Sequence, residues 1–444
     1  TRAHGRRVGN FVGGRATWPG RSMPLIDPAT GRPDGEVALS DPEDVDAAVR
    51  AAKEAAPSWA AWPLEARCAA LSRLADAVEA AAPALAEAES RDNGKPLALA
   101  RTLDIPRSVA NLRFFASLAP HAGGAVQRAS GPMESMSYSV RKPVGVVGVV
   151  TPWNLPLYLL TWKLAPALAM GNAVVAKPSE LTPTTALMLA ELCGDAGIPP
   201  GAFGVVQGQG HVAGQALVSH PDVSAVSFTG GTATGAAVAA LAAPQFKKVS
   251  LELGGKNAAV VFDDCDFEAA IAGVTRSAFL NSGQICLCSS RILVQRGPDG
   301  AFYRRFVDGL VAAARGLVVA APGDPAADLG PLVSQAQLDK AQAAVLAARG
   351  EGGEVLCGGG APSVGASHDR GFFSEPALAG GLGASSAVAQ QVHPFDTEDE
   401  AIALANSTRC TSSTPRTRPS RWPTARGAPV RHRGRGHRAG QQHA

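Results

Sequence analysis

The chain has 444 residues, of which 46% are apolar and 18% charged, and this length and composition allow two or three domains with a large buried core. It contains no run near the ~20 apolar residues of a membrane helix, and its first residues lack the apolar core of a signal peptide. Seven scattered cysteines favour reduced thiols in a cytoplasm over a disulfide framework.

The charge is unevenly distributed along the chain. The formal net charge is +3, but the 41 basic residues include eight arginines beyond residue 410, where no acidic residue occurs. Residues 1–410 therefore carry 33 basic and 38 acidic side chains and are mildly acidic. Only residues 411–444 have a charge that could bind nucleic acid or another anionic surface.

The first third of the chain is predicted to be mainly helical. Asp41 is placed as an N-cap with Pro42 at the first helical position. From Leu64 to Ser90 the apolar residues recur at helical spacing, and residues 97–120 continue as helix. The alternating stretch MESMSYSVRKP, from Met133, is typical of one strand of a β-hairpin.

From Gly145 onward, apolar strands alternate with helices. This alternation predicts an α/β fold with a parallel sheet and right-handed crossovers, whose ligands bind beyond the carboxyl ends of the strands. A second α/β region follows, and the glycine-rich stretch from Gly353 is predicted to be a surface connection. The predicted strands are residues 144–151, 172–179, 203–208, 225–231 and 256–262, and the predicted helices are residues 156–170, 182–197, 211–220, 232–242 and 267–281.

Polar and glycine residues follow two of these strands. Lys177 could bind ribose hydroxyls or a phosphate, and Glu180 could accept hydrogen bonds from a ribose diol while disfavouring a 2′-phosphate. Gly230 and Gly235 precede and begin a helix, where unpaired amides can receive a pyrophosphate. Taken alone, the charged pair could be a solvated loop and the glycines a tight turn.

Two further segments carry a carboxylate and a thiol. Glu252 lies in LELGGKN, and Cys286 lies in FLNSGQICLCSSR, on a turn that opens with Gly283. A thiolate nucleophile and a carboxylate that activates water are what covalent oxidation of an aldehyde requires. Taken alone, the thiol could be a core residue, the carboxylate a surface charge and Asn154 a turn residue. Cys288 is interpreted as a packing residue, because no Cys or His cluster accompanies it.

The segments PWN, KPSE, FTGG and LELGG, in this order and each at the end of a predicted strand, together with the cysteine segment GQIC, resemble the signatures of the NAD(P)-dependent aldehyde dehydrogenase superfamily. The resemblance covers roughly residues 8–392. It implies Cys286 as the nucleophile, Glu252 as the group that activates water, and Asn154 with the backbone N–H of Cys286 as oxyanion donors. It implies NAD, rather than NADP, bound by Thr151, Pro152, Trp153, Lys177, Ser179, Glu180, Gly230, Gly231, Gly235 and Leu253.

The resemblance also implies a Rossmann-like NAD-binding domain at residues 1–124 and 144–254, an oligomerisation hairpin at 125–143 and an α/β catalytic domain at 255–410. Other segments, among them PWNLPLYLLTWKLAP and ICLCSSRILVQ, are similar to 2-aminomuconic and 2-hydroxymuconic semialdehyde dehydrogenases, whose substrates carry a remote carboxylate. Arg107 is then the expected carboxylate ligand, with Leu155 and Trp162 near the same pocket. An ion pair on a helix is the other interpretation of Arg107.

The sequence departs from the family in two places. The E-[IV]-F-G-P motif, whose glutamate holds the nicotinamide ribose, is missing between the V-A-Q segment and His393. Residues 411–444 have no periodicity and are expected to be a disordered, frameshifted tail that leaves the oligomerisation elements incomplete. The alternatives are a broad-range or betaine-aldehyde-type dehydrogenase, a truncated inactive remnant that binds nucleotide, and a nucleic-acid-binding tail. No metal is expected, and a homo-oligomer is expected from the family.

Overall fold

The computed structural model describes residues 6–130, 133–383, 386, 388 and 391–407. The tail expected at residues 411–444 lies outside them.

The first long helix, α1 (Pro42–Ala61), begins as its sequence predicts. The Asp41 side chain accepts hydrogen bonds from the N–H groups of Glu43 and Asp44, and the Asp44 carboxylate accepts one from the N–H of Asp41. The expected helix from Leu64 to Ser90 is instead two helices, α2 (Leu64–Ala80) and α3 (Ala82–Asn93). The break comes at Ala81 because Pro83 has no N–H to continue a helix but is compatible with a first turn.

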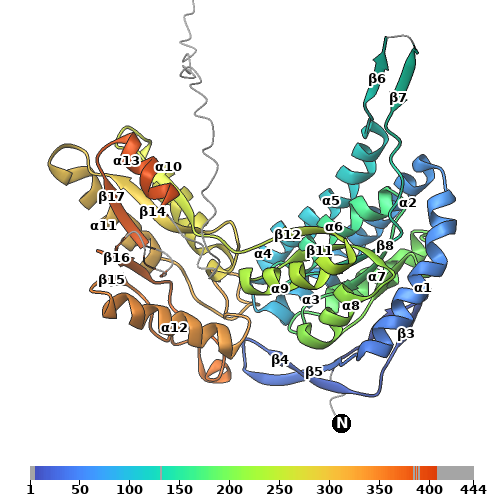
Figure 1. Ribbon diagram of the computed structural model, residues 1–444. Helices are drawn as coiled ribbons and strands as arrows, with labels where there is room; N and C mark the ends of the chain where they lie inside the picture. The colour runs from blue at the N-terminus through green and yellow to red at the C-terminus, as the bar shows by residue number, and fades with distance from the viewer. Residues whose placement is uncertain (1–5, 131–132, 384–385, 387, 389–390, 408–444) are drawn as a thin grey trace, which may run out of the picture. The chain divides into compact units, whose positions relative to one another are not determined.

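A seven-stranded sheet forms the first core (Figure 1). Its five parallel strands confirm the predicted α/β pattern, and two short antiparallel strands, which the sequence analysis did not predict, extend it. In sheet order the strands are β12 (Lys248–Glu252), β11 (Val223–Thr229), β8 (Val146–Val150), β9 (Ala173–Lys177), β10 (Phe203–Val205), β2 (Asn10–Val12) and β3 (Arg15–Thr17).

Helices cover both faces of this sheet, because successive side chains of a strand point to opposite faces. Val147 and Val149 of β8 pack against the helices on one face of the sheet. Val146 and Val150 pack against the helices on the other face. The first layer contains α2, α5 (Ile105–Leu118), α6 (Pro156–Ala169) and α7 (Thr184–Asp195), and the second contains α1, α8 (Gln215–Ser219) and α9 (Thr232–Ala242).

A second, five-stranded sheet forms the other core. Helices α10 (Phe267–Phe279) and α11 (Ala301–Arg315) pack on the face that contains Ile292 and Val294, and α13 (Glu398–Asn406) packs beside Leu293 on the other face. The order of strands is β13 (Asn257–Val261), β14 (Ser289–Gln295), β17 (Gln391–Phe395), β16 (Leu378–Gly380) and β15 (Glu354–Cys357), and α12 (Gln335–Gly350) contacts β15.

Two details of this sheet correct or qualify the sequence analysis. Strand β15 begins the stretch predicted to be a glycine-rich connection, so that interpretation was wrong for its first residues; Leu356 and Cys357 have the side chains needed to pack against the core. Strand β17 pairs in parallel with β14 along its whole length. The strand after the missing E-x-F-G-P piece is therefore retained in the sheet.

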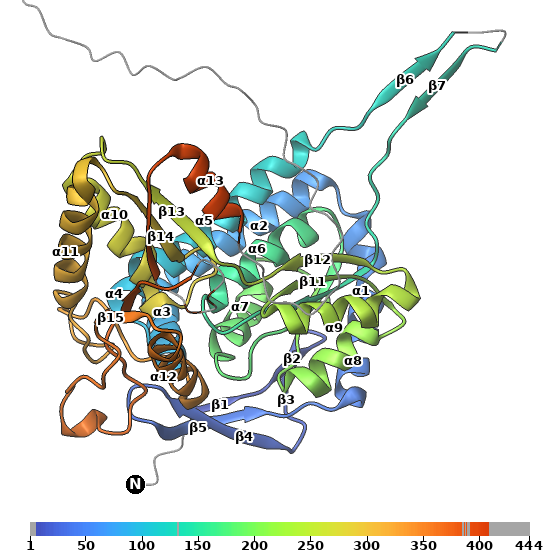
Figure 2. The same ribbon diagram turned by 60° about the vertical axis from the view of Figure 1, so that its left-hand side comes forward.

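Two smaller sheets complete the described fold. Strands β1 (Arg6–Val8), β5 (Arg32–Ala38) and β4 (Ser22–Asp27) form one of them. The predicted hairpin is present as β6 (Val126–Ala129) and β7 (Ser135–Tyr138), which pair antiparallel and extend away from the helices (Figure 2). Every residue of these two strands is exposed, so the hairpin has no packing partner within the described part of the chain.

Candidate active site

The loop between α10 and β14 carries Cys286 at an exposed position. It begins with three consecutive left-handed residues, Asn281, Ser282 and Gly283, whose φ angles are 54°, 55° and 74°. A non-glycine residue in this region costs about 1–3 kcal/mol, so bonds to neighbouring elements must hold the turn. One such bond runs from Ser282 Oγ to the carbonyl of Gly330, at 2.9 Å.

Asn154 connects the end of β8 to this loop. Its Nδ2 donates to the carbonyl oxygen of Gln284 at 2.7 Å, two residues before Cys286. In return, Asn281 Nδ2 donates to the carbonyl oxygen of Asn154 at 3.0 Å. The amide predicted to stabilise an oxyanion and the thiol predicted to attack are thus brought together from segments about 130 residues apart.

The ionisation of Cys286 is set by opposing interactions. Burial raises the pKa of its thiol, and the charge of Glu252 raises it further. The backbone N–H groups of Cys286 itself and of Leu287 lower this pKa, because they stabilise the thiolate. The net direction is upward, so the thiol by itself is mainly protonated at neutral pH.

Glu252 is the last residue of β12 and is exposed, and its carbonyl oxygen accepts a hydrogen bond from Gly230 N–H at 3.0 Å. The charge of its carboxylate also affects the pKa of Lys163, a residue that was not predicted to belong to the site. Burial lowers the pKa of Lys163 to about 8, and the charge of Glu252 opposes this shift. The only signal for Lys163 in the sequence is a single cation within the apolar helix PLYLLTWKLAPALA.

The predicted cofactor residues gather at one edge of the first sheet. They lie there because β8, β9, β11 and β12 are parallel and their carboxyl ends coincide. The residues are Thr151, Pro152 and Trp153 after β8, Lys177 at the end of β9 with Ser179 and Glu180 beyond it, Gly230 and Gly231 after β11, Gly235 in the first turn of α9, and Leu253 after β12.

The polar groups at this edge fit a dinucleotide. The buried hydroxyl oxygens of Thr151 and Thr229 have no hydrogen-bond partner in the described part of the chain. Gly231 caps α9 without a side-chain hydrogen bond, which leaves amides of the first turn for an anionic ligand. Lys177 Nζ donates to Glu180 at 3.2 Å and to the carbonyl of Gly208 at 2.6 Å, and burial lowers its pKa.

The predicted substrate residues lie on α5 and on α6, with Leu155 at the N-terminus of α6 and Trp162 in its middle. The guanidinium of exposed Arg107 lies 5.6 Å from the ring centroid of Tyr158, and the rings of Tyr158 and Trp162 are 6.5 Å apart in an edge-to-face arrangement. Leu155 is buried, whereas Trp162 is 42% exposed. Tyr158, which the sequence analysis missed, thus joins Arg107 to an aromatic surface that begins four residues after Asn154.

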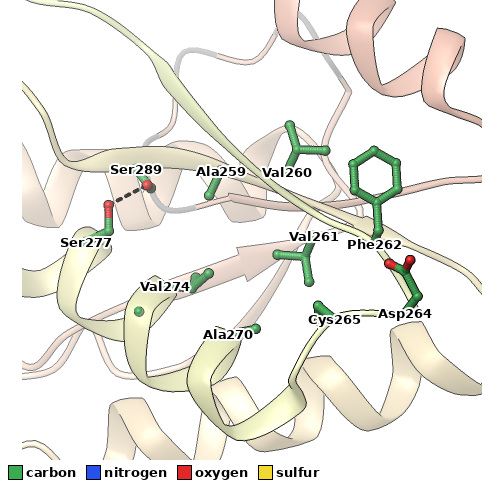
Figure 3. Close-up of a pocket in the computed structure, with 11 residues that line it drawn as sticks. Ala259, Val260, Val261, Phe262, Asp264, Cys265, Ala270, Val274, Ser277 and Ser289 are labelled. Carbon is green, nitrogen blue, oxygen red and sulfur yellow. Dashed lines mark hydrogen bonds between the residues drawn. The ribbon is translucent and has the colours of Figure 1, made fainter. Parts of the chain in front are cut away.

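Two cavities lie against strands of the second sheet. One, of about 430 Å³, is lined by Cys286, Trp153 and Glu375 among others, and the exposed thiol opens into it. The other, of about 390 Å³, lies between β13 and α10 (Figure 3). Its lining is mainly apolar, with Asp264, the hydroxyls of Ser277 and Ser289, and Cys265, whose pKa burial raises. No side-chain amide or cation lines this cavity that could donate to a developing oxyanion. The cavity beside Cys286 is therefore the candidate site.

The cavity beside Cys286 does not include every predicted site residue. Arg107, Leu155, Trp162, Asn154 and Glu252 are not among the residues that line it. Among the described residues no group of three or more His, Cys, Asp or Glu side chains could hold a metal ion. The described helices include none long and apolar enough to cross a membrane.

Comparisons with known proteins show which chains this one is similar to. Residues 16–414 match the model of the aldehyde dehydrogenase family. The chain is 46% identical to the 2-aminomuconic semialdehyde dehydrogenase of Mus musculus, over 90% of this chain and 83% of that protein. It is 42% identical to the 2-hydroxymuconic semialdehyde dehydrogenase of Pseudomonas sp. (strain CF600), with the same coverage.

A solved structure is also similar. The crystal structure of PnpE in complex with nicotinamide adenine dinucleotide superimposes with a TM-score of 0.86, at 36% identity, over 91% of this chain and 83% of that chain. The family match, the identities and the shared fold lead to one conclusion: this chain belongs to the aldehyde dehydrogenase family.

Proposed function

We propose that this chain oxidises an aldehyde with a second, remote carboxylate to the corresponding acid, with NAD+ as the hydride acceptor and through a thioester on Cys286. The observation that carries the proposal is an exposed thiol on a loop whose Gln284 carbonyl accepts a hydrogen bond from the Asn154 amide, with the charge of Glu252 acting on the same thiol.

In the first step the Cys286 thiolate attacks the aldehyde carbon, a C–S bond forms and the carbonyl oxygen becomes an oxyanion. Asn154 has two N–H groups, and one of them is engaged by Gln284. The other, together with the N–H of Cys286, can donate to the oxyanion. When bound, the oxidised nicotinamide accepts the hydride that leaves this carbon, and the C=O double bond re-forms as a thioester.

In the second step Glu252 takes a proton from water, and the resulting hydroxide attacks the thioester carbon. The C–S bond breaks, the acid leaves and the thiol is restored. The exposed position of Glu252 supports this role, because water can reach its carboxylate. The raised pKa of the thiol implies that the first step quickens as the pH rises, because the thiolate fraction grows.

The proposed preference for NAD over NADP rests on Glu180. A carboxylate at this position would accept hydrogen bonds from ribose hydroxyls and repel a 2′-phosphate. Thr151, Lys177, Ser179, Gly230 and the first turn of α9 would hold the rest of the dinucleotide. Pro152, Trp153, Gly231, Gly235 and Leu253 would supply its close backbone and apolar contacts.

The proposed preference for a carboxylated aldehyde rests on Arg107. Its guanidinium is exposed and is oriented by the Tyr158 ring at the start of the helix that follows Asn154. A guanidinium can bind a carboxylate through two parallel hydrogen bonds. An apolar residue at this position would instead suit aliphatic aldehydes.

The test is kinetic. In Arg107→Ala, KM for a muconic semialdehyde should rise about 10- to 100-fold, the worth of a charge-assisted hydrogen bond, while KM for an uncharged aldehyde changes little. Arg113→Ala is the matched control, because Arg113 lies on the same helix but pairs with Asp76 and Glu79. Equal effects of Arg107→Ala on both aldehydes would contradict the substrate proposal, and failure of the unaltered chain to form NADH would support an inactive remnant.

We also propose that the chain self-associates in a reducing compartment such as the cytoplasm. The fully exposed hairpin supports self-association, since Val126, Met136 and Tyr138 are each 67% exposed. The free thiols of six described cysteines support the compartment. Sizing chromatography with light scattering tests the first point, and a monomer at micromolar concentration would contradict it.

A further inference from the structure

The backbone that carries Asn154 rests on three buried side chains of α3 and the turn after it. Asn93 Nδ2 donates to the carbonyl of Trp153 at 2.9 Å, and Lys95 Nζ donates to the carbonyl of Asn154 at 3.0 Å. The Glu89 carboxylate accepts the N–H of Leu157 at 3.3 Å, in the first turn of α6. The three side chains belong to residues that are at most 1% exposed.

Lys95 is held as a buried ion rather than as a packing residue. Its Nζ lies 2.7 Å from Asp104 Oδ1 and 4.0 Å from Glu89 Oε1. Burying such an ion costs several kcal/mol, so an apolar side chain of similar volume would serve packing at least as well. Besides its bond to Asp104, Lys95 donates to the Asn154 carbonyl. The buried charge of Lys95 is therefore best explained by its hydrogen bond to the Asn154 carbonyl, which fixes that peptide.

The Asn154 peptide is thus fixed from two sides. Lys95 Nζ and Asn281 Nδ2 both donate hydrogen bonds to its carbonyl oxygen, each at 3.0 Å. With its backbone held, the side-chain amide reaches the Gln284 carbonyl at 2.7 Å. Catalytic groups displaced by about 1 Å can lose about 10²-fold in rate, so this placement has a direct bearing on the reaction.

We infer that Glu89, Asn93 and Lys95 form a clamp of positioning residues that places the Asn154 amide opposite Cys286. The inference rests on the role proposed above for Asn154. The clamp touches neither thiol nor substrate and acts only through the loop from Trp153 to Leu157.

The experiment removes Lys95 together with Asp104, the nearer of its two carboxylate partners. The double variant Lys95→Met/Asp104→Asn should lower kcat/KM for the aldehyde by about 10²-fold, mainly through kcat, with little change in the Kd for NAD+. In the background of Asn154→Ala, which itself should cost about 10²–10³-fold, the same two substitutions should change kcat/KM by less than about threefold, because coupled residues are not additive. Lys53→Met/Asp222→Asn, a remote surface pair at 2.6 Å, is the control.

Three outcomes separate the possibilities. Equal losses with and without Asn154 would overturn the clamp, because a general structural defect adds to any other. No loss in the otherwise unaltered chain would also overturn it. If Asn154→Ala itself leaves kcat/KM unchanged, the role proposed for Asn154 fails, and the clamp with it. If the double variant does not fold, Asn93→Ala replaces it. This substitution removes the hydrogen bond to the Trp153 carbonyl, and its effect on kcat/KM is measured with and without Asn154→Ala in the same way.

Discussion

Replacing Lys163 by methionine tests the electrostatics beside Glu252. Lys163 is 6% exposed, and its Nζ donates to Ser227 Oγ at 3.1 Å. Burial lowers its pKa from 10.5 to about 8, against the opposing effect of Glu252. The unfolded chain therefore binds more protons at Lys163 than the folded chain between pH 8 and 10.5, so this residue makes stability rise with pH in that window.

The magnitude follows from these two values. A pKa lowered from 10.5 to about 8 corresponds to a penalty of roughly 3 kcal/mol on the folded state below pH 8. This penalty falls to below about 1 kcal/mol at pH 10. Methionine removes the penalty but also the bond to Ser227, worth about 1 kcal/mol. Lys163→Met should thus be more stable than the unaltered chain by about 2 kcal/mol at pH 7, and no more stable at pH 10.

The assay is urea unfolding followed by tryptophan fluorescence, with midpoints compared at pH 7, 8, 9 and 10. Lys247, whose pKa burial also lowers to about 8, titrates in both proteins and cancels in the difference. Lys248→Met, at an exposed lysine of β12, is the control and should show no such trend. A difference between Lys163→Met and the unaltered chain that stays constant from pH 7 to 10 would refute the reasoning.

Two further changes test the nucleophile and its scaffold. Glu252→Gln should speed alkylation of Cys286 by iodoacetamide at pH 7–8, because it removes a charge that raises the pKa of the thiol, yet it should abolish steady-state turnover; slower alkylation would contradict the arrangement. Gly330→Ala should destabilise the fold by about 1–3 kcal/mol, measured as a lower urea midpoint, because the new Cβ would lie 2.0 Å from the Gly94 carbonyl. Gly323→Ala, where a Cβ meets nothing within 4 Å, is its control, and equal midpoints would be the contrary result.

Local patterns were sufficient for much of the fold. The continuous apolar runs of β8 and β9 and the cap at Asp41 are properties of short segments, so the parallel strands and the start of α1 could be predicted from them. Pro83 marks the break at Ala81, but the helical periodicity continues on both sides of it and so conceals the break. Strands β2 and β3 have only three residues each, too few for a recognisable period.

The sequence by itself determined where four parallel strands of the first sheet lie, and so most of the polar groups that meet at its edge, and a resemblance joined Cys286 to Glu252 and Asn154. Only the tertiary structure decided how deeply those groups are buried and which charges lie beside them. Whether Lys163 is buried beside Ser227, or Lys95 beneath the carbonyl of Asn154, depends on contacts between segments about 60 residues apart. Burial and nearby charges shift pKa values, and hydrogen bonds from distant segments fix carbonyl groups. The periodicity and composition of a single segment contain no record of these effects.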